Sequence, residues 1–401
     1  MIDRRKLLGA ASLISIGSVS SLALAAPSGK PIRIGSSLAL TGPLSSAGLL
    51  HKIAGEIYVD NLNSRNGLLG RPVEWVVRDD QSRPDMARSL YEQLITGDKV
   101  DLLLGPYGTG TILSAMGVAQ RYKKLLIHHS FGIPHLAKYE MQFPAWGIGA
   151  TPETTFPNLV FDAFASLPKA PKTIAVVTSK FPSAHFLSLG AREVAKRRGL
   201  SEVLFLEWEF GVSNFSAIAA RLKDTNPDAI WVGSIGSEGN QLIEACIKVG
   251  YRPPLHIHLY PAPLPMAQSP SLDGALAASL FESHPPFTQL PGVAEFIKSY
   301  SDRAIKAGLP DPLPETQAAA SYVAWQMFEV AITATQSLDD AILANWLKKN
   351  KIDTIYGRVR FDGINNYGDD HFKIKQVQSG RWVTVWPKEF AAPGASIRVK
   401  S

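Results

Sequence analysis

The loop Gly105–Thr111, with the sequence G-P-Y-G-T-G-T, combines the residue types that a carboxylate site needs. Its glycines, among them Gly108, allow the backbone to approach a ligand closely. The loop precedes a predicted helix, so Thr109 can cap that helix and hold its hydroxyl beside several unpaired backbone amides. Tyr107 adds an aromatic ring. The pattern predicts a carboxylate site, although a Thr that only caps a helix would produce the same pattern.

Other loops that follow predicted strands are further candidates for ligand contacts. In open α/β sheets, ligands bind outside the carboxyl ends of the strands, at the topological switch point. We therefore expect a ligand among the loops at these ends, which are Thr41–Gly48, Gly105–Thr111, His129–Ile133, Ser179–His185, Gly233–Glu238 and Leu259–Pro263.

Histidines stand at the ends of two predicted strands, His128-His129 and His256-x-His258. Adjacent residues of a strand point to opposite faces, so His128 and His129 cannot easily share one metal ion. His256 and His258 can share a face, but no Cys or nearby acid completes a ligand set. We expect no metal site; one of these histidines can instead hydrogen-bond a ligand.

Motifs of enzymes are missing from the sequence. It has no G-x-S-x-G elbow, no Walker A loop and no H-E-x-x-H. The loop 105–110 lacks the G-x-G-x-x-G order and an acidic ribose partner. Asp79-Asp80 is a carboxylate pair, but its place after a strand is typical of a turn. We expect neither catalysis nor a cofactor.

The elements that position these loops alternate between strand and helix, which predicts parallel sheets with helices on both faces. The first half contains the strands Ile32–Ala39, Val73–Arg78, Leu102–Leu104 and Leu125–His128 and the helices Ala47–Asn61, Pro84–Thr96 and Thr111–Tyr122. The pattern repeats from the helix Phe156–Ser166 to the strand Leu255–His258, and Cys246 falls on an apolar helix stripe. A return to the first half is expected near Gly274–Ser283. The predicted helices after it are Gly292–Ala307, Thr316–Gln336 and Leu338–Asn350, and the predicted strands are Arg358–Phe361, Phe372–Val377 and Arg381–Trp386. The last two strands should form a hairpin.

Length and composition agree with two exported lobes. A chain of 401 residues that is 45% hydrophobic suits two domains with full cores. Residues 1–25 carry Arg4-Arg5-Lys6, an apolar segment and an A-x-A cleavage signal before Ala26, which predicts an export signal of either the twin-arginine or the ordinary secretory type. Without this leader the net charge falls from +6 to +4, and no basic cluster is interleaved with aromatics, so nucleic acid is not implied. Cys246 is the only cysteine, which excludes an internal disulfide and predicts a buried thiol.

The order of motifs between Ile32 and Asp80 resembles the periplasmic leucine/isoleucine/valine-binding proteins of ABC importers. A strand is followed by L-T-G-P-L-S-S-A-G, a helix, N-S-R-N-G-L-L-G, a second strand and D-D. This resemblance implies a type I periplasmic binding protein, with two doubly wound parallel-sheet lobes joined by three hinge crossings near Gly149, Leu280 and Lys373. Residues 32–148 plus 280–372 would form the N-terminal lobe, and 149–279 plus 373–401 the C-terminal lobe.

The resemblance also implies ligand contacts and shows departures from the family pattern. Thr109 matches the Ser or Thr that binds the ligand carboxylate, and Ser130 matches a residue that offers its backbone carbonyl. Gly132 replaces the usual Thr, Ser183 replaces a Tyr that closes over the ligand, and Tyr260 replaces the acid that pairs with the ligand ammonium. Unless Glu238 or another acid substitutes, these departures favour an apolar or aromatic carboxylate over an α-amino acid. Tyr107, Gly108, Phe131 and Gly132 complete the predicted site.

The function that follows is the periplasmic substrate-binding component of an ABC importer, with a permease and an ATPase as membrane partners. The same fold could alternatively serve as a ligand-sensing module of a signalling receptor or regulator. An exported α/β enzyme is a third class that no motif supports.

Overall fold

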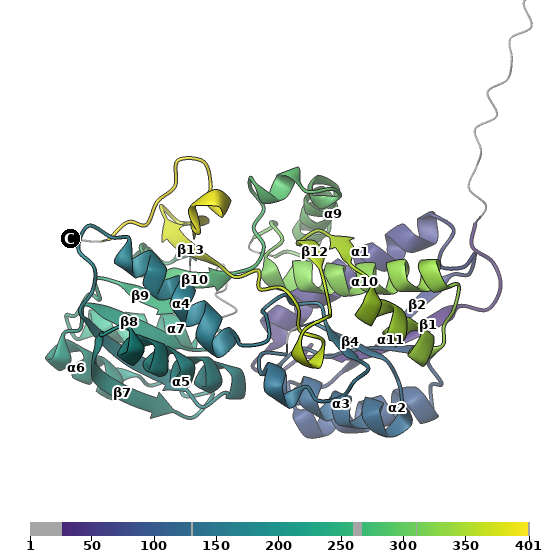
Figure 1. The fold of residues 1–401 in the computed structure, drawn as a ribbon, viewed down its shortest axis with the longest axis horizontal. Coiled ribbons are helices and arrows are strands. Elements are labelled where there is room, and N and C mark those ends of the chain that lie inside the picture. Colours follow the sequence, from purple (N-terminus) through teal and green to yellow (C-terminus); the bar gives the residue numbers. More distant parts are fainter. Residues whose placement is uncertain (1–25, 130, 260–266, 310, 400–401) are drawn as a thin grey trace, which may run out of the picture.

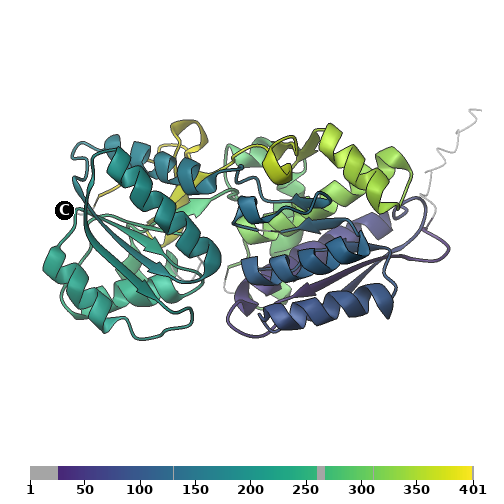
Figure 2. The same ribbon diagram turned by 60° about the horizontal axis from the view of Figure 1, so that its bottom comes forward.

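The computed structural model describes residues 26–129, 131–259, 267–309 and 311–399. The predicted leader and two predicted site residues, Ser130 and Tyr260, lie outside the described residues. Two α/β lobes lie side by side along the long axis of the molecule (Figures 1 and 2).

The first lobe contains a five-stranded parallel sheet in the order β2-β1-β3-β4-β5. Its strands are β1 (Ile32–Leu38), β2 (Val73–Asp79), β3 (Leu102–Leu104), β4 (Leu126–His128) and β5 (Gln142–Pro144). Its helices are α1 (Ser45–Ser64), α2 (Pro84–Thr96), α3 (Thr109–Tyr122), α9 (Val293–Lys306), α10 (Thr316–Thr335) and α11 (Asp340–Lys349). Helix α1 packs against α9 and α10, α2 packs against α3, and Figure 1 shows these two groups on opposite faces of the sheet. Short apolar strands are expected when both faces are covered in this way.

The second lobe contains a seven-stranded sheet in the order β14-β13-β10-β9-β8-β6-β7. Its strands are β6 (Thr173–Ser179), β7 (Ser201–Trp208), β8 (Ala229–Gly233), β9 (His256–His258), β10 (Leu276–Ser279), β13 (Lys373–Gln378) and β14 (Arg381–Trp386). The strands β6 to β10 run parallel, whereas β13 is antiparallel to both β10 and β14. The helices are α4 (Pro152–Ala165), α5 (Pro182–Arg197), α6 (Ser216–Thr225) and α7 (Glu238–Lys248), with α4 packed on α5 and α6 on α7. The predicted terminal hairpin is confirmed.

The chain passes between the two sheets three times, from β5 to α4, from β10 to α9, and from the small hairpin β11 (Ile352–Thr354) and β12 (Gly357–Val359) to β13. The two-lobe fold with three crossings is therefore confirmed. The return expected near Gly274–Ser283 begins only after Ser279, because β10 is a buried strand of the second sheet, paired with β9 and β13. Strands β5 and β11 were not expected, since three residues are too few to show a period.

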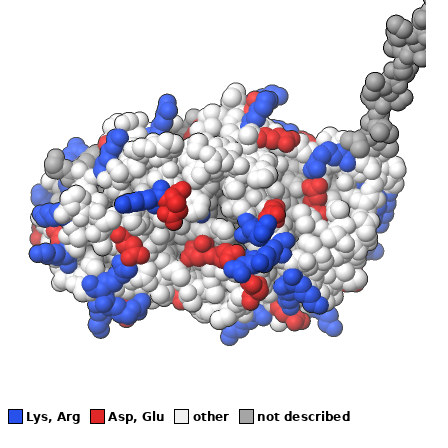
Figure 3. Space-filling model, turned by 45° about the horizontal axis from the view of Figure 1, so that its top comes forward, with Lys and Arg blue, Asp and Glu red and all other residues white. Residues whose placement is uncertain are grey.

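The surface carries charges of both signs. On the face in Figure 3, Lys and Arg side chains lie among Asp and Glu side chains. None of the helices in the described part of the chain has the length and apolarity of a membrane span. Cys246 is buried, as predicted, and burial raises the pKa of its thiol to about 12.

Candidate functional site

The glycine-rich loop after β3 places Thr109 at the first position of α3. Gly108 has φ 100°, a conformation that glycine adopts without strain, and it is the residue before the helix. The helix therefore begins at Thr109, and not at Thr111 as expected. The predicted capping role of Thr109 is wrong, because the residue that precedes the helix is Gly108 and no side chain caps α3. Thr111 instead donates its hydroxyl to the carbonyls of Tyr107 and Gly108, at 2.5 and 2.7 Å.

The amino end of α3 is consequently well suited to an anion. The first N–H groups of a helix have no intrahelical acceptor and form the positive end of its dipole. Thr109 is 4% exposed, and its hydroxyl is not used to cap the helix. Backbone amides and a hydroxyl thus meet at one buried point, as a carboxylate site requires.

Gly132, Ser183 and Thr109 meet where the two lobes touch. A Cβ atom built on Gly132 would lie 2.7 Å from Ser183 Cβ and 3.9 Å from Thr109 Oγ1. Gly132 follows β4 of the first sheet, and Ser183 lies in the first turn of α5, which follows β6 of the second sheet. The strand-end loops of both sheets therefore converge, and only a residue without a side chain fits at position 132.

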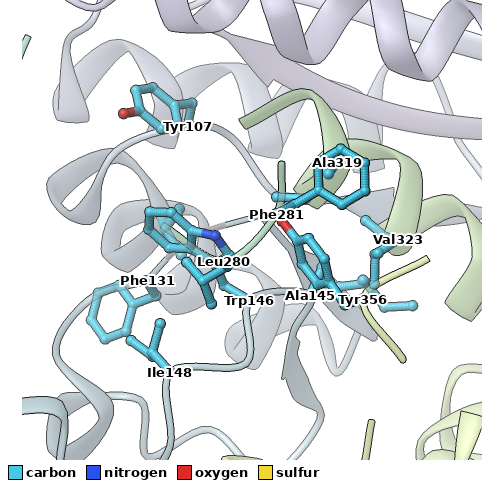
Figure 4. Packing of buried hydrophobic residues seen from close by; sticks show 14 of the residues in the cluster. Tyr107, Phe131, Ala145, Trp146, Ile148, Leu280, Phe281, Ala319, Val323 and Tyr356 are labelled. Atoms are coloured by element: carbon cyan, nitrogen blue, oxygen red, sulfur yellow. The ribbon is translucent and has the colours of Figure 1, made fainter. Parts of the chain in front are cut away.

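Aromatic residues surround this convergence. Tyr107 and Phe131 are buried, and Figure 4 shows them in one cluster with Trp146, Ile148 and Leu280. The Phe131 carbonyl accepts a hydrogen bond of 2.8 Å from the Tyr367 hydroxyl, which fixes the loop after β4. Two of the predicted aromatic site residues thus lie in the apolar cluster between the lobes, while Tyr260 is outside the described residues.

A buried polar cluster beneath Tyr107 was not predicted as a unit. His51 of α1 lies 4.9 Å from Tyr107 and 4.2 Å from His129, measured between ring centroids. His51 Nε2 is 3.1 Å from Gln317 Oε1 at the start of α10. Sequence reasoning noted His129 but missed His51 and Gln317, since the only signal was a polar residue among the mostly apolar buried positions of each helix.

Burial keeps the histidines of this cluster neutral. Burial lowers the pKa of His51 well below its usual value, with a smaller effect of His129, while the bond to Gln317 opposes the shift. Burial also lowers the pKa of His129 to about 3, against the effect of the Pro106 backbone. The two histidines therefore make this buried cluster polar but uncharged.

Glu238 is the acid that could have replaced the missing partner of a ligand ammonium. It is buried at the start of α7, and its Oε1 accepts a hydrogen bond of 2.9 Å from the Gly211 backbone. Burial raises its pKa, and the bond from Gly211 opposes this shift. Glu238 thus already bonds a loop of its own lobe.

A buried ion pair lies where the chain crosses between the lobes. Lys375 Nζ on β13 is 3.0 Å from Glu282 Oε1, and Ser279 donates a further hydrogen bond of 2.6 Å to the same oxygen. Both charged side chains are less than one-tenth exposed. Burial raises the pKa of nearby Glu315 to about 7, while Lys375 opposes this shift. This ion pair therefore links the chain segments of the second and third crossings between the lobes.

The remaining histidines form no metal centre in the described part of the chain, where no three His, Cys, Asp or Glu side chains are grouped as a metal requires. His128 bonds Gln142 at 2.6 Å, and His256 bonds His258 at 2.8 Å. Asp79 accepts hydrogen bonds from the backbone N–H groups of Leu40, Thr41 and Gln81, which agrees with the predicted turn.

A family model described as periplasmic binding protein matches residues 31–382. The chain belongs to the periplasmic binding protein family. The Leu/Ile/Val-binding protein of Escherichia coli is 23% identical over 327 residues, which is 81% of this chain and 84% of that protein. The predicted resemblance to the leucine/isoleucine/valine-binding proteins is confirmed.

Solved structures of the same family share the fold. LivJ from Streptococcus pneumoniae, in complex with isoleucine, superposes with a TM-score of 0.74 at 19% identity, covering 88% of this chain and 98% of LivJ. A solute-binding protein of an ABC transporter from R. palustris, in complex with benzoate, gives a TM-score of 0.73 at 18% identity, with coverage of 88% and 95%. This periplasmic binding protein therefore shares its architecture with proteins that bind chemically different solutes.

Proposed function

We propose that this periplasmic binding protein is the exported substrate-binding component of an ABC importer and binds an apolar or aromatic carboxylate between its lobes. The observation that carries the proposal is the convergence of Thr109, Gly132 and Ser183 from the two sheets. Residues 1–25 would direct export and be removed near Ala25-Ala26. The permease and ATPase would be its membrane partners.

The amino end of α3 would hold the carboxylate. Thr109 and the free amides there supply hydrogen-bond donors, and Ser130 would assist from the neighbouring loop. Tyr107, Gly108, Phe131 and Tyr260 would contact the body of the ligand. Hydrogen bonds to an ionised acceptor are stronger than those between neutral groups, so these donors favour the anion.

Domain closure would trap the ligand. The proposed hinge consists of the crossings near Gly149, Leu280 and Lys373, with residues 32–148 plus 280–372 and residues 149–279 plus 373–401 as the two moving bodies. Closure around a ligand by a hinge of a few residues is a known structural transition. The contact between Gly132 and Ser183 supports this proposal, because it joins loops from the two sheets.

The acids near the cleft support a carboxylate in preference to an α-amino acid. An ammonium buried without a counter-charge is costly. Glu238 bonds Gly211, and Glu315 lies in the field of Lys375. Both acids therefore already interact with groups of the protein itself.

A thermal-shift screen of residues 26–401 tests the proposal, because a ligand that binds only the folded state raises the melting temperature. The screen compares aromatic and aliphatic carboxylates with leucine-type amino acids and short amides. Carboxylates without an ammonium should give a shift. A shift with leucine-type amino acids alone would contradict the ligand class and indicate Glu238 or Glu315 as the ammonium partner.

Thr109→Ala tests the carboxylate site. We expect it to weaken binding of the best carboxylate by roughly 10- to 150-fold, since a hydrogen bond to a charged group contributes about 1.5–3 kcal/mol. Calorimetry measures this affinity, and the melting temperature of the unliganded variant reports its folding. Unchanged affinity would show that Thr109 does not hold the carboxylate.

A further inference from the structure

The polar cluster of His51, His129 and Gln317 is not explained by carboxylate binding at α3. All three side chains are fully buried. Their residues belong to α1, the loop after β4 and the first turn of α10, and His51 contacts both of the others. The His51 ring contacts the ring of Tyr107, two residues before Thr109, so the cluster borders the proposed carboxylate site.

Several polar atoms of this cluster have no hydrogen-bond partner among the described residues. These atoms are His51 Nδ1, Gln317 Nε2 and one ring nitrogen of His129, whose other ring nitrogen interacts with the Pro106 backbone. Buried polar groups in folded proteins are nearly always paired with protein, water or ligand. Three such atoms in contacting side chains therefore indicate a site that a further polar group completes.

The protonation of the cluster defines the chemistry of that group. Gln317 Oε1 can only accept, so His51 Nε2 carries the proton of their hydrogen bond and His51 Nδ1 is an acceptor. Gln317 Nε2 is a donor, and neutral His129 supplies an acceptor nitrogen, because its N–H donates to the Pro106 carbonyl. A hydroxyl both donates and accepts and brings no charge, so it matches this set.

A charged substituent does not match the cluster. Neither His51 nor His129 is protonated near neutral pH, because burial lowers the pKa of both. A second carboxylate would thus meet no cation here, and an ammonium would meet no anion within the cluster. Burial of an unpaired charge costs more than burial of a hydroxyl.

We propose that His51, His129 and Gln317 form a subsite for an uncharged hydroxyl, so that the preferred ligand is a hydroxylated carboxylate. This inference rests on the proposed function, since the carboxylate is taken to bind at Thr109. It adds a second polar anchor and defines specificity within the carboxylate class.

The test compares matched ligands by calorimetry on residues 26–401. The probes are benzoate, its 3- and 4-hydroxy derivatives, 4-methoxybenzoate and terephthalate, together with 4-methylpentanoate and 2-hydroxy-4-methylpentanoate. A hydroxylated member should bind about tenfold more tightly than its parent, the effect of one buried hydrogen bond. The methoxy derivative, which cannot donate, and terephthalate, which adds a charge, should not show this gain.

His129→Phe is the decisive variant, and His128→Phe is its matched control. His129→Phe removes one unpaired ring nitrogen together with the bond to the Pro106 backbone, so we expect the melting temperature to change little while the hydroxyl preference disappears. His128→Phe deprives Gln142 Oε1 of its hydrogen-bond partner, so we expect a lower melting temperature with the preference retained. Gln317→Leu provides a second test of the same loss if His129→Phe does not fold.

The outcomes separate the inference from the proposed function. If carboxylates bind but hydroxylated and parent ligands bind equally, the subsite is overturned and the carboxylate proposal stands. A hydroxyl preference that survives both His129→Phe and Gln317→Leu also overturns the subsite. If no carboxylate binds the wild-type protein, the proposed function fails, and the inference fails with it.

Discussion

Gly132→Ala should weaken ligand binding without unfolding either lobe. The added Cβ would lie 2.7 Å from Ser183 Cβ, whereas carbon atoms in ordinary contact are about 3.5–4.0 Å apart. The two loops would have to separate by about 1 Å, and such overpacking costs about 1–3 kcal/mol. Because the contact joins loops of the two lobes, this cost would fall on the proposed closed state. Affinity should then fall roughly 5- to 150-fold.

The assay is a double-mutant cycle with the carboxylate that gives the largest thermal shift. Ser183→Gly removes the opposing Cβ, so Gly132→Ala/Ser183→Gly should recover most of the affinity that Gly132→Ala loses. Gly117→Ala in α3 is the control, because a Cβ at Gly117 would meet nothing within 4 Å. Wild-type affinity in Gly132→Ala, or no recovery in the double variant, would refute closure through this contact.

Three further predictions concern buried groups. Lys375→Met should lower the free energy of unfolding by about 3–5 kcal/mol, because it leaves the Glu282 carboxylate buried without its counter-charge. In urea titrations, Lys375→Met/Glu282→Leu should regain much of the lost free energy. An equal loss in the single and the double variant would contradict the ion-pair argument. In the folded protein, burial, Glu282 and Asp311 raise the pKa of Glu315 to about 7, while Lys375 opposes this shift. The folded protein therefore binds more protons at Glu315 than the unfolded protein does. Stability should consequently fall as pH rises from about 4.5 to about 7. Glu315→Gln should flatten this part of the pH profile relative to wild type, and parallel profiles would exclude the effect. Cys246 should resist a thiol-specific reagent in the folded protein and react after unfolding, since it is buried and burial raises its pKa to about 12. Rapid labelling of the folded protein would show instead that the thiol is accessible.

Sequence reasoning selected the candidate loops because their residue types follow strand ends. Thr109 was placed correctly beside free helix amides, but its capping role was wrong, since Gly108 at positive φ is the residue before the helix. Gly132 appeared as a departure that removed a ligand contact. The structure gives a steric reason for it, because Ser183 from the other lobe occupies the space of a side chain. Ser183 lies 51 positions away, and no local pattern could reveal that contact.

The sequence by itself determined the alternation of buried strands and helices, and hence the two doubly wound lobes, because periodicity and turn residues act over a few neighbouring positions. Only the tertiary structure decided which strands share a sheet, as for β10, and which polar residues meet. His51, His129 and Gln317 come from three distant segments, and their missing partners are evident only when α1, β4 and α10 are packed together. Burial and hydrogen-bond pairing are properties of that packing, so the chemistry of the cluster could not be derived from the chain alone.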